Sequence, residues 1–397
     1  MDVYQEKIKQ AGQLLAEFDL DAWLVFVRET AEHTDPVIKL LGPLNAVWEA
    51  AFVFGRGGQR IAIAGQGDDE AIRRLGLFDE VIPYTQSIRN DLVRVLTRLN
   101  PRTIGLNYSR SDVSADGLTY GMFLNLQGYL RETVWLDRLV SAEAFVDAWR
   151  GRKTPQELNR MRRANDIAME IFAATGEWLR PGLSEKEIHQ FVHEQTRQHG
   201  VETSWEADFC PGLNAGPNSP WGHVGASDEK TAPGYTLNMD FGVKVNGYCS
   251  DHQRVWYFLR EGETEAPPEV VKIFEAVVGA IQAAADFVRP GLQGWEVDAV
   301  ARDYLVRAGY PEYPHALGHA VGRYAHDGGT GFYPRWERYG NKPYSQIVEN
   351  GVFTLELGVR SEFGYISLEE EILVTATGCE WFSPPQKALM LVPFRRS

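Results

Sequence analysis

The residues best suited to chemistry are acids and histidines in the second half of the 397-residue chain. Asp240 and Asp251 flank Asn246-Gly247, a pair typical of a type I′ turn between two strands. A two-residue loop would place Gly242 opposite Asp251 and leave room there for an ion, with Asp240 on the same face, diagonal to Asp251. Two carboxylates on one sheet face repel unless a cation lies between them. Because aromatic residues surround this hairpin, it predicts a cation site rather than a solvated acidic surface.

Histidines form the second group. Three of the nine in the chain, His315, His319 and His326, lie within PHALGHAVGRYAHDGG. Neutral imidazole is a common metal ligand and a proton donor near neutral pH. A single histidine among such small and apolar neighbours would indicate packing, whereas three together beside several glycines favour a site.

Two acidic strands follow, VFTLELGV and GYISLEEEILVT. Alternation puts Glu356 on the polar face of the first strand; in the second, Glu369 and Glu371 share one face and Glu370 takes the other. Periodicity alone does not show which of Glu369, Glu370 and Glu371 enters a site. The two that do not are expected at a solvated edge. Two Asp, one or more His and two Glu form a hard, oxygen-rich set. Such a set suits a pair of Mn²⁺, Co²⁺, Zn²⁺ or Fe²⁺ ions and does not suit a thiolate zinc site.

The elements that position these residues follow from periodicity. Apolar runs of strand length at 22–27, 50–55, 60–65 and 103–107 alternate with amphipathic stretches, as in an α/β domain. Thr154-Pro155, with an acid in the next turn, predicts a helix start. We therefore place a domain boundary near residue 150 and expect domains at 1–150 and 151–397.

The second domain contains an internal repeat. Segments 179–202 and 288–312 each run from Arg-Pro-Gly-Leu into a helix with an acidic first turn. Matching lengths and order predict two similar α+β halves, with a natural site between them.

Composition limits the class of protein. The net charge of −14 disfavours nucleic acid and anionic membrane surfaces as partners. The sequence has no basic-then-apolar leader and no apolar run of membrane-spanning length, and its three cysteines are scattered. These features argue against secretion, membrane insertion and a disulfide framework, so we expect a cytoplasmic enzyme.

Over about 155–390 these motifs resemble the metal-dependent pita-bread peptidases of family M24, namely methionine aminopeptidase, aminopeptidase P and prolidase. The resemblance implies an α+β fold: a C-terminal pita-bread (creatinase/aminopeptidase) domain of two similar α+β halves, preceded by a smaller α/β creatinase-type N-terminal domain. It implies two divalent metal ions per subunit, with Mn²⁺ expected ahead of Co²⁺, Zn²⁺ or Fe²⁺, and a homodimer. The metal ligands that it implies, in family order and spacing, are Asp240, Asp251, His319, Glu356 and Glu369.

The flanking histidines resemble those of the proline-specific branch. His223 matches the substrate-side histidine before the hairpin, His326 the one facing the scissile carbonyl, and His315 the first histidine of a PHGLGH motif. These three would bind substrate, while His223, His326 and Glu356 would be catalytic, with a hydroxide bridging the metals. The expected substrate is a peptide with proline at its second position, cut by an Xaa-Pro aminopeptidase or Xaa-Pro dipeptidase.

Three positions depart from the family pattern. Leu357 replaces the proline of Glu-Pro-Gly, Gln253 replaces the threonine before Arg254, and Ser367 replaces an arginine two residues before the last ligand. The missing arginine leaves open how a dipeptide's carboxylate or the proline side is held, and Arg360 is a possible substitute. The alternative functions are a creatinase-like amide hydrolase and a catalytically silent binding protein. Retention of all five ligands argues against both.

Overall fold

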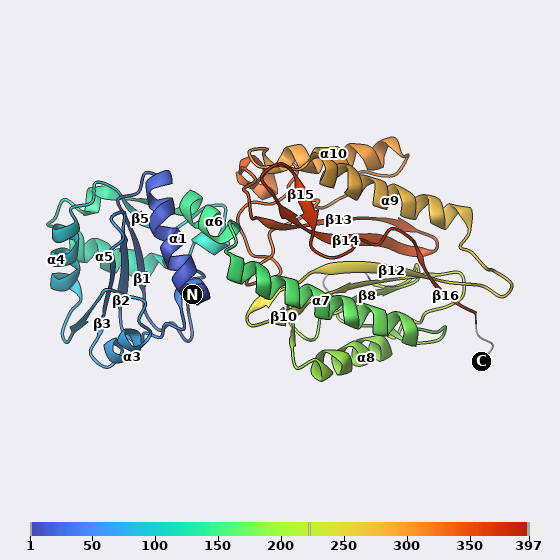
Figure 1. The fold of residues 1–397 in the computed structure, drawn as a ribbon, viewed down its shortest axis with the longest axis horizontal. Coiled ribbons are helices and arrows are strands. Elements are labelled where there is room, and N and C mark those ends of the chain that lie inside the picture. Colours follow the sequence, from blue (N-terminus) through green and yellow to red (C-terminus); the bar gives the residue numbers. More distant parts are fainter. Residues whose placement is uncertain (1, 221, 223, 395–397) are drawn as a thin grey trace. The chain divides into compact units, whose positions relative to one another are not determined.

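The computed structural model describes residues 2–220, 222 and 224–394. The chain divides into two units, Met1–Gln156 and Glu157–Ser397. The division falls in the first turn of α7 (Pro155–Trp178), the helix whose start Thr154-Pro155 predicts. Both units mix helices with sheets, and the smaller one comes first, in agreement with the predicted α+β fold class (Figure 1).

The N-terminal unit is built on a six-stranded sheet in the order β4-β3-β2-β1-β5-β6. Among these strands β2 runs antiparallel to both neighbours, and the other pairings are parallel. The four predicted strands are confirmed as β1, β2, β3 and β5. The elements of this unit are α1 (Val3–Glu17), β1 (Ala22–Val27), α2 (Ile38–Leu41), β2 (Ala50–Gly55), β3 (Arg60–Gly65), α3 (Asp69–Arg74), β4 (Glu80–Tyr84), α4 (Arg89–Leu99), β5 (Ile104–Leu106), the 3₁₀ turn Val113–Ala115, α5 (Tyr120–Leu130), the 3₁₀ turn Leu136–Arg138, β6 (Leu139–Ser141) and α6 (Glu143–Gly151).

Helices cover both faces of this sheet because its central strands are apolar on both sides. In β1, Trp23 and Val25 pack with α1 and α6, whereas Leu24 and Phe26 pack with α4 and α5. The six residues of β1 are therefore all buried, which explains its continuous apolar run.

The C-terminal unit contains a seven-stranded sheet whose main path is β13-β14-β12-β9-β8, with β15 on β14 and β16 on β12. A second, three-stranded sheet has the order β11-β10-β7. The elements after α7 are α8 (Glu185–Gln198), β7 (Glu202–Thr203), β8 (Gly212–Ala215), β9 (Thr236–Phe241), β10 (Val243–Val245), β11 (Tyr248–Cys249), β12 (His252–Phe258), α9 (Pro268–Phe287), α10 (Gly294–Arg307), the 3₁₀ turns Glu337–Tyr339 and Lys342–Tyr344, β13 (Val352–Ser361), β14 (Gly364–Val374), β15 (Cys379–Trp381) and β16 (Met390–Val392).

Two halves of this unit repeat one plan. The first half is α7, α8 and β7–β12, and the second is α9, α10 and β13–β15 (Figure 1). The second helix of each half starts with a capping box, formed by Ser184 with Glu187 in α8 and by Gln293 with Glu296 in α10. The two repeated segments of the sequence thus contain equivalent helices, α8 and α10.

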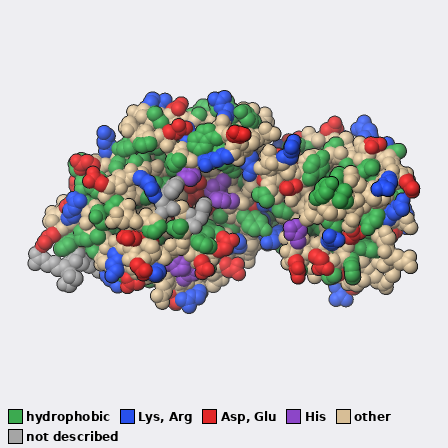
Figure 2. Space-filling model, turned by 180° about the vertical axis from the view of Figure 1, so that it is seen from behind, with side chains coloured by type: hydrophobic (Ala, Val, Ile, Leu, Met, Phe, Trp, Pro, Cys, Tyr) green, Lys and Arg blue, Asp and Glu red, His purple; other side chains and the backbone are tan. Residues whose placement is uncertain are grey.

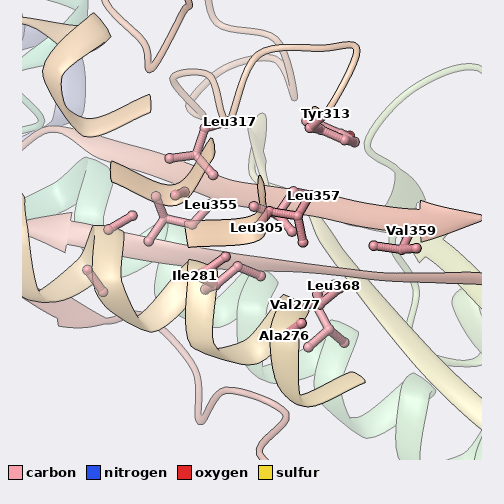
Figure 3. Close-up of a cluster of buried hydrophobic side chains, with 14 of the residues drawn as sticks. Ala276, Val277, Ile281, Leu305, Tyr313, Leu317, Leu355, Leu357, Val359 and Leu368 are labelled. Carbon is pink, nitrogen blue, oxygen red and sulfur yellow. The ribbon is translucent and has the colours of Figure 1, made fainter. Parts of the chain in front are cut away.

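The helices of both halves cover one face of the large sheet. Met239 of β9 packs with α7 and α8, while Leu355, Leu357 and Leu368 of β13 and β14 pack with α9 and α10. Figure 3 shows Val277 and Ile281 of α9 beside these strand residues. Since side chains alternate along a strand, the residues between these apolar ones point to the opposite face. That face carries the acids of interest.

Candidate metal centre

A hairpin positions the first two acids. Asn246 and Gly247 have φ angles of 49° and 79°, so the predicted type I′ turn is confirmed. The turn sets Val245 opposite Tyr248, and the same register continues to Asp240 opposite Gln253. The carboxyl groups of Asp240 and Asp251 consequently lie in contact.

Gly242, in the same hairpin, is required for a reason other than the predicted one. A Cβ added there would lie 1.8 Å from the backbone oxygen of Ser250. The glycine therefore allows two backbone segments to approach each other. The prediction that a glycine is needed here to make room for an ion was wrong.

The second half contributes a histidine and two glutamates to the same place. His319 Nε2 lies 3.9 Å from Asp251 Oδ2, 3.7 Å from Glu356 Oε1 and 3.6 Å from Glu369 Oε1. Glu356 and Glu369 are cross-strand partners in β13 and β14, and Glu369 pairs across to Gln253 of β12. The cluster therefore lies where the sheet strands of the two halves meet. The structure brings together all five predicted ligands: Asp240, Asp251, His319, Glu356 and Glu369.

Burial dominates the electrostatics of this cluster. Burial, followed by the charge of neighbouring carboxylates, raises the pKa of Asp240, Asp251 and Glu356 well above the usual range. Burial raises the pKa of Glu369 to about 7 and lowers that of His319 to about 4. Each group is thus shifted toward its neutral form, as expected for acids crowded in a low-dielectric site without a countercharge.

These residues fit divalent cations. His319 Nδ1 lies 3.3 Å from the carbonyl oxygen of Ala320, which can accept a hydrogen bond from Nδ1–H and so leave the lone pair of Nε2 directed at the carboxylates. Asp240 Oδ1 is buried and has no hydrogen-bond partner among the described residues. Four acids and an imidazole lone pair that face one another are unfavourable without a cation between them. Hard oxygen donors with one imidazole are ligands that Mn²⁺, Fe²⁺, Co²⁺ and Zn²⁺ accept.

Gln253 contacts two of the acids. Its Nε2 donates to Glu369 Oε2 at 3.1 Å and to Glu356 Oε2 at 3.4 Å. In the sequence this residue was noted as a departure from the family pattern and was given no role. Its position opposite Asp240 in the hairpin register was the signal that could have identified it.

Glu370 and Glu371 were expected at a solvated edge, and that prediction was wrong. Both are buried, with 1% of their surface exposed. β14 is an interior strand between β13 and β12, so its side chains have no solvated edge. Glu370 forms a buried ion pair with Arg254 at 3.0 Å, and Glu371 accepts a hydrogen bond from the backbone N–H of Asp251.

The predicted substrate histidines have different positions. His326 is exposed, and its ring centroid lies 4.2 Å from that of His319. His315 is half-buried and its ring contacts that of Tyr313 at 5.5 Å. His223 lies outside the described residues. Figure 2 shows histidine side chains gathered in a hollow on one face of the C-terminal unit.

A cavity of about 800 Å³ lies in the N-terminal unit near the ends of β1, β3 and β4. Its lining includes Arg28, Glu49 and Tyr129, and the described residues form no cluster of metal ligands there. The chemistry is therefore concentrated in the C-terminal unit. In the part of the chain that the structure describes, the helices are too short or too polar to cross a lipid bilayer.

Comparison with known proteins agrees with this geometry. The chain is 28% identical over 287 residues to the Xaa-Pro dipeptidase of Lactobacillus helveticus, covering 71% of this chain and 73% of the relative. It is 28% identical over 320 residues to the Xaa-Pro dipeptidase of Lactobacillus delbrueckii subsp. lactis, covering 80% and 81%.

Solved structures show the same fold. The Xaa-Pro dipeptidase from Bacillus anthracis superposes with a TM-score of 0.73 at 23% identity, covering 98% of this chain and 100% of that one. The X-Pro aminopeptidase from Thermotoga maritima MSB8 gives a TM-score of 0.72 at 23% identity, covering 96% and 100%. Residues 159–376 match the model of metallopeptidase family M24. Since this match spans more than half of the chain and includes the four acids and the histidine of the cluster, the protein belongs to metallopeptidase family M24.

Proposed function

We propose that the protein hydrolyses the peptide bond before proline, in Xaa-Pro dipeptides or at the N-terminus of longer peptides. The observation that carries the proposal is the convergence of three carboxylates on the imidazole of His319 at 3.6–3.9 Å, with Asp240 in contact with one of them, Asp251. Two relatives named Xaa-Pro dipeptidase support the choice of substrate. The proposal includes a cytoplasmic location, as predicted from the sequence, and a homodimer, as implied by the family resemblance.

Asp240, Asp251, His319, Glu356 and Glu369 would hold two divalent cations, with Mn²⁺ expected first. When bound, such cations supply a Lewis-acid centre that polarises a carbonyl and lowers the pKa of water toward neutrality. The remaining work falls to the protein's own side chains.

Glu356 is the proton carrier in this proposal. Its side chain is 21% exposed, against 6% for Asp251 and 2% for Glu369, so it is the one of these three most accessible to substrate and water. It accepts a proton from the attacking water and delivers it to the proline nitrogen. Because that nitrogen carries no hydrogen in the peptide, it must gain one before it leaves as an amine.

His326 stabilises the carbonyl oxygen as negative charge develops on it. Its exposed ring beside His319 is placed to donate a hydrogen bond to a substrate held at the cluster. His223 would supply a second donor, and His315 would contact the substrate on the side of Tyr313.

A substrate panel with a matched variant pair tests the function. Metal-stripped protein is reloaded with Mn²⁺ and assayed on Gly-Pro, Ala-Pro and Ala-Pro-Gly against Gly-Ala, Ala-Ala and Ala-Ala-Gly. We expect cleavage before proline to be preferred, and Glu356→Gln to lose roughly 10³-fold or more in kcat with an unchanged fold. Glu362→Gln, in the exposed turn between β13 and β14, is the control and should keep full activity.

Two results would contradict the proposal. Near-normal turnover by Glu356→Gln would remove its catalytic role. Cleavage of non-proline amides without cleavage of any Xaa-Pro bond would favour an amide hydrolase on the same fold.

A further inference from the structure

The cavity of about 800 Å³ in the N-terminal unit lies at one edge of the six-stranded sheet. Strands β1, β3 and β4 run in the same direction, because β2 is antiparallel to both β1 and β3, and β4 is parallel to β3. The residues around the cavity end or follow these three strands, or precede β2. The cavity therefore opens at the carboxyl ends of parallel strands, which is the edge where open α/β sheets bind ligands.

Glu49, which directly precedes β2, is fixed in this cavity by three hydrogen bonds. Its carboxylate accepts from Asn125 Nδ2 at 2.8 Å and from the Tyr129 hydroxyl at 2.6 Å, both on α5. Its carbonyl oxygen accepts from the Tyr84 hydroxyl at 2.8 Å. Burial, followed by the influence of Glu49, raises the pKa of both phenols to about 12, so they remain neutral donors. A carboxylate has about four acceptor positions, so this one can accept further hydrogen bonds from a ligand.

Arg28 lies across from Glu49 at the same edge. Arg28 directly follows β1, and the register of β1 and β2 pairs Val27 with Ala50, the residue after Glu49. Side chains at opposite positions of paired strands start about 5 Å apart. Nevertheless the exposed guanidinium of Arg28 forms no ion pair or hydrogen bond with any residue that the structure describes. A cation and an anion that are close but not paired with each other match a ligand that carries both charges.

Three aromatic side chains, Trp48, Tyr84 and Tyr129, line the cavity beside these charges. Trp48 is 67% exposed, and its indole rests on Gly65 at the end of β3, where an added Cβ would lie 3.2 Å from Trp48 Cδ1. The indole is thus supported on one side and open on the other, so it can stack on an apolar or aromatic group of a ligand. The faces of aromatic rings also attract an ammonium group.

The charge and the volume of the cavity limit the class of ligand. Its charged residues are Arg28, Glu29 and Glu49, so the lining is negative overall. A negative lining disfavours phosphates and nucleotides. The volume lies within the range of small-molecule sites and is much larger than an inorganic ion requires. A zwitterion with a large apolar body satisfies the charges, the rings and the volume together.

We propose that this cavity binds a free α-amino acid with a large apolar or aromatic side chain. Glu49 accepts hydrogen bonds from the ammonium group, and the rings of Tyr84 and Tyr129 flank it. Arg28 pairs with the carboxylate of the ligand, and the side chain of the ligand stacks on Trp48. The described residues form no cluster of metal ligands here, so the cavity binds without hydrolysing. The inference does not depend on the proposed function.

Titration calorimetry on the full-length, Mn²⁺-loaded protein tests this with three probes that contain no peptide bond. L-Phenylalanine carries both charges, phenethylamine carries only the ammonium group, and hydrocinnamate carries only the carboxylate. The variants are Glu49→Gln, Arg28→Gln and Trp48→Ala. Arg110→Gln is the control, because Arg110 is exposed and lies outside the lining of the cavity. Unfolding midpoints verify the fold of each variant, and the same titrations on chelator-treated protein identify any binding to metal ions.

We expect L-phenylalanine to bind with a Kd of about 1 mM or below, with or without metal. Glu49→Gln should raise the Kd of L-phenylalanine and phenethylamine about tenfold or more and leave hydrocinnamate within about twofold, because only the ammonium group meets this carboxylate. Arg28→Gln should raise the Kd of L-phenylalanine and hydrocinnamate by a similar factor and leave phenethylamine within about twofold. Trp48→Ala should weaken all three probes about threefold or more, and Arg110→Gln should change none.

Three results would overturn the proposal. The first is that L-phenylalanine does not bind at millimolar concentration. The second is that it binds with a Kd that neither Glu49→Gln nor Arg28→Gln changes, which would place the ligand elsewhere in the protein. The third is that its binding disappears when the metal is removed. Because cleavage of Xaa-Pro bonds is not measured in these titrations, a failure of the proposed function would leave this inference standing.

Discussion

The backbone N–H of Asp251 donates a hydrogen bond of 2.5 Å to Glu371 Oε1, while Asn165 Nδ2 donates to Glu371 Oε2 at 3.0 Å. His252 continues this contact, with its Nε2 2.6 Å from Asn165 Oδ1. A buried carboxylate of β14 thus ties helix α7 to the backbone of a candidate metal ligand. Outer groups of this kind orient ligands and adjust metal affinity.

We predict that Glu371→Leu lowers Mn²⁺ affinity by roughly 10–100-fold, the usual effect of losing an outer-shell partner. The substitution leaves the N–H of Asp251 and the amide of Asn165 without their acceptor, at about 1–3 kcal/mol for each buried group. Glu371→Gln retains one acceptor oxygen and should lose much less. Titration calorimetry measures the affinity, with Glu362→Leu as the exposed control; equal affinity in all three variants would contradict the prediction.

Removal of metal should lower stability as well as activity. Four acids and an imidazole lone pair face one another in the cluster, and a cation that binds the folded state alone adds about 2.7 kcal/mol at a concentration of 100 times Kd. We expect chelator-treated protein to unfold at a lower temperature and Mn²⁺ to restore the midpoint in a concentration-dependent way. Calorimetric scans with Asp240→Asn beside the unchanged protein provide the check. An unfolding midpoint that changes with neither chelator nor Mn²⁺ would show that the cluster binds no ion.

Arg302 should be needed to hold the loop that leads into His319. Its guanidinium pairs with Asp298 at 2.8 Å, and it donates to the carbonyl oxygens of Tyr313 and of His315, the latter at 2.7 Å. Breaking a buried ion pair by removing one partner costs about 3–5 kcal/mol, so Arg302→Met should be strongly destabilised in denaturant titrations. The exposed pair Arg74–Glu70 offers a matched control, since Arg74→Met should cost less than about 1 kcal/mol. Similar losses in the two variants would refute this assignment.

Asp35 predicts a pH dependence in the N-terminal unit. Burial raises its pKa to about 6, against 3.8 for an exposed group, despite hydrogen bonds from Asn107 and the backbone of Val37. Between these two values the unfolded chain releases a proton that the folded chain keeps, so the free energy of unfolding falls as pH rises and levels off above about pH 6. The loss is on the order of 2–3 kcal/mol.

Asp35→Asn should lack this component. The difference in unfolding free energy between the unchanged protein and the variant should decrease from pH 4 to pH 6 or 7, as measured by denaturant titration. Asp19→Asn, at an exposed position, is the control. A difference that is constant with pH would show that folding does not raise the pKa of Asp35.

Local patterns predicted much of the fold and of the cluster. Asn246-Gly247 specifies one turn type, and that turn alone fixes the register that joins Asp240 to Asp251. The apolar run of β1 and the start of α7 at Pro155 likewise depend on residues close in sequence. Spacing along the chain was therefore sufficient for these features.

Long-range pairing was not predictable in the same way. Glu370 and Glu371 were misplaced because their burial depends on β12 and α7, more than a hundred residues away, which supply Arg254 and Asn165. Gln253 was overlooked because its contact with Glu369 requires the pairing of β12 with β14. Alternation indicates which side of a strand a residue faces, but not what covers that side.

The division of the cluster between two halves has a consequence for how the protein assembles. Asp240 and Asp251 meet through a short hairpin, which closes at small entropic cost, whereas His319, Glu356 and Glu369 join them only when β14 docks on β12. Two of the five candidate ligands therefore depend on a local contact, and the other three depend on a long-range pairing of strands. A cation bound by both sets would have to dissociate before β14 separates from β12, so we expect bound metal to slow the unfolding of the C-terminal unit.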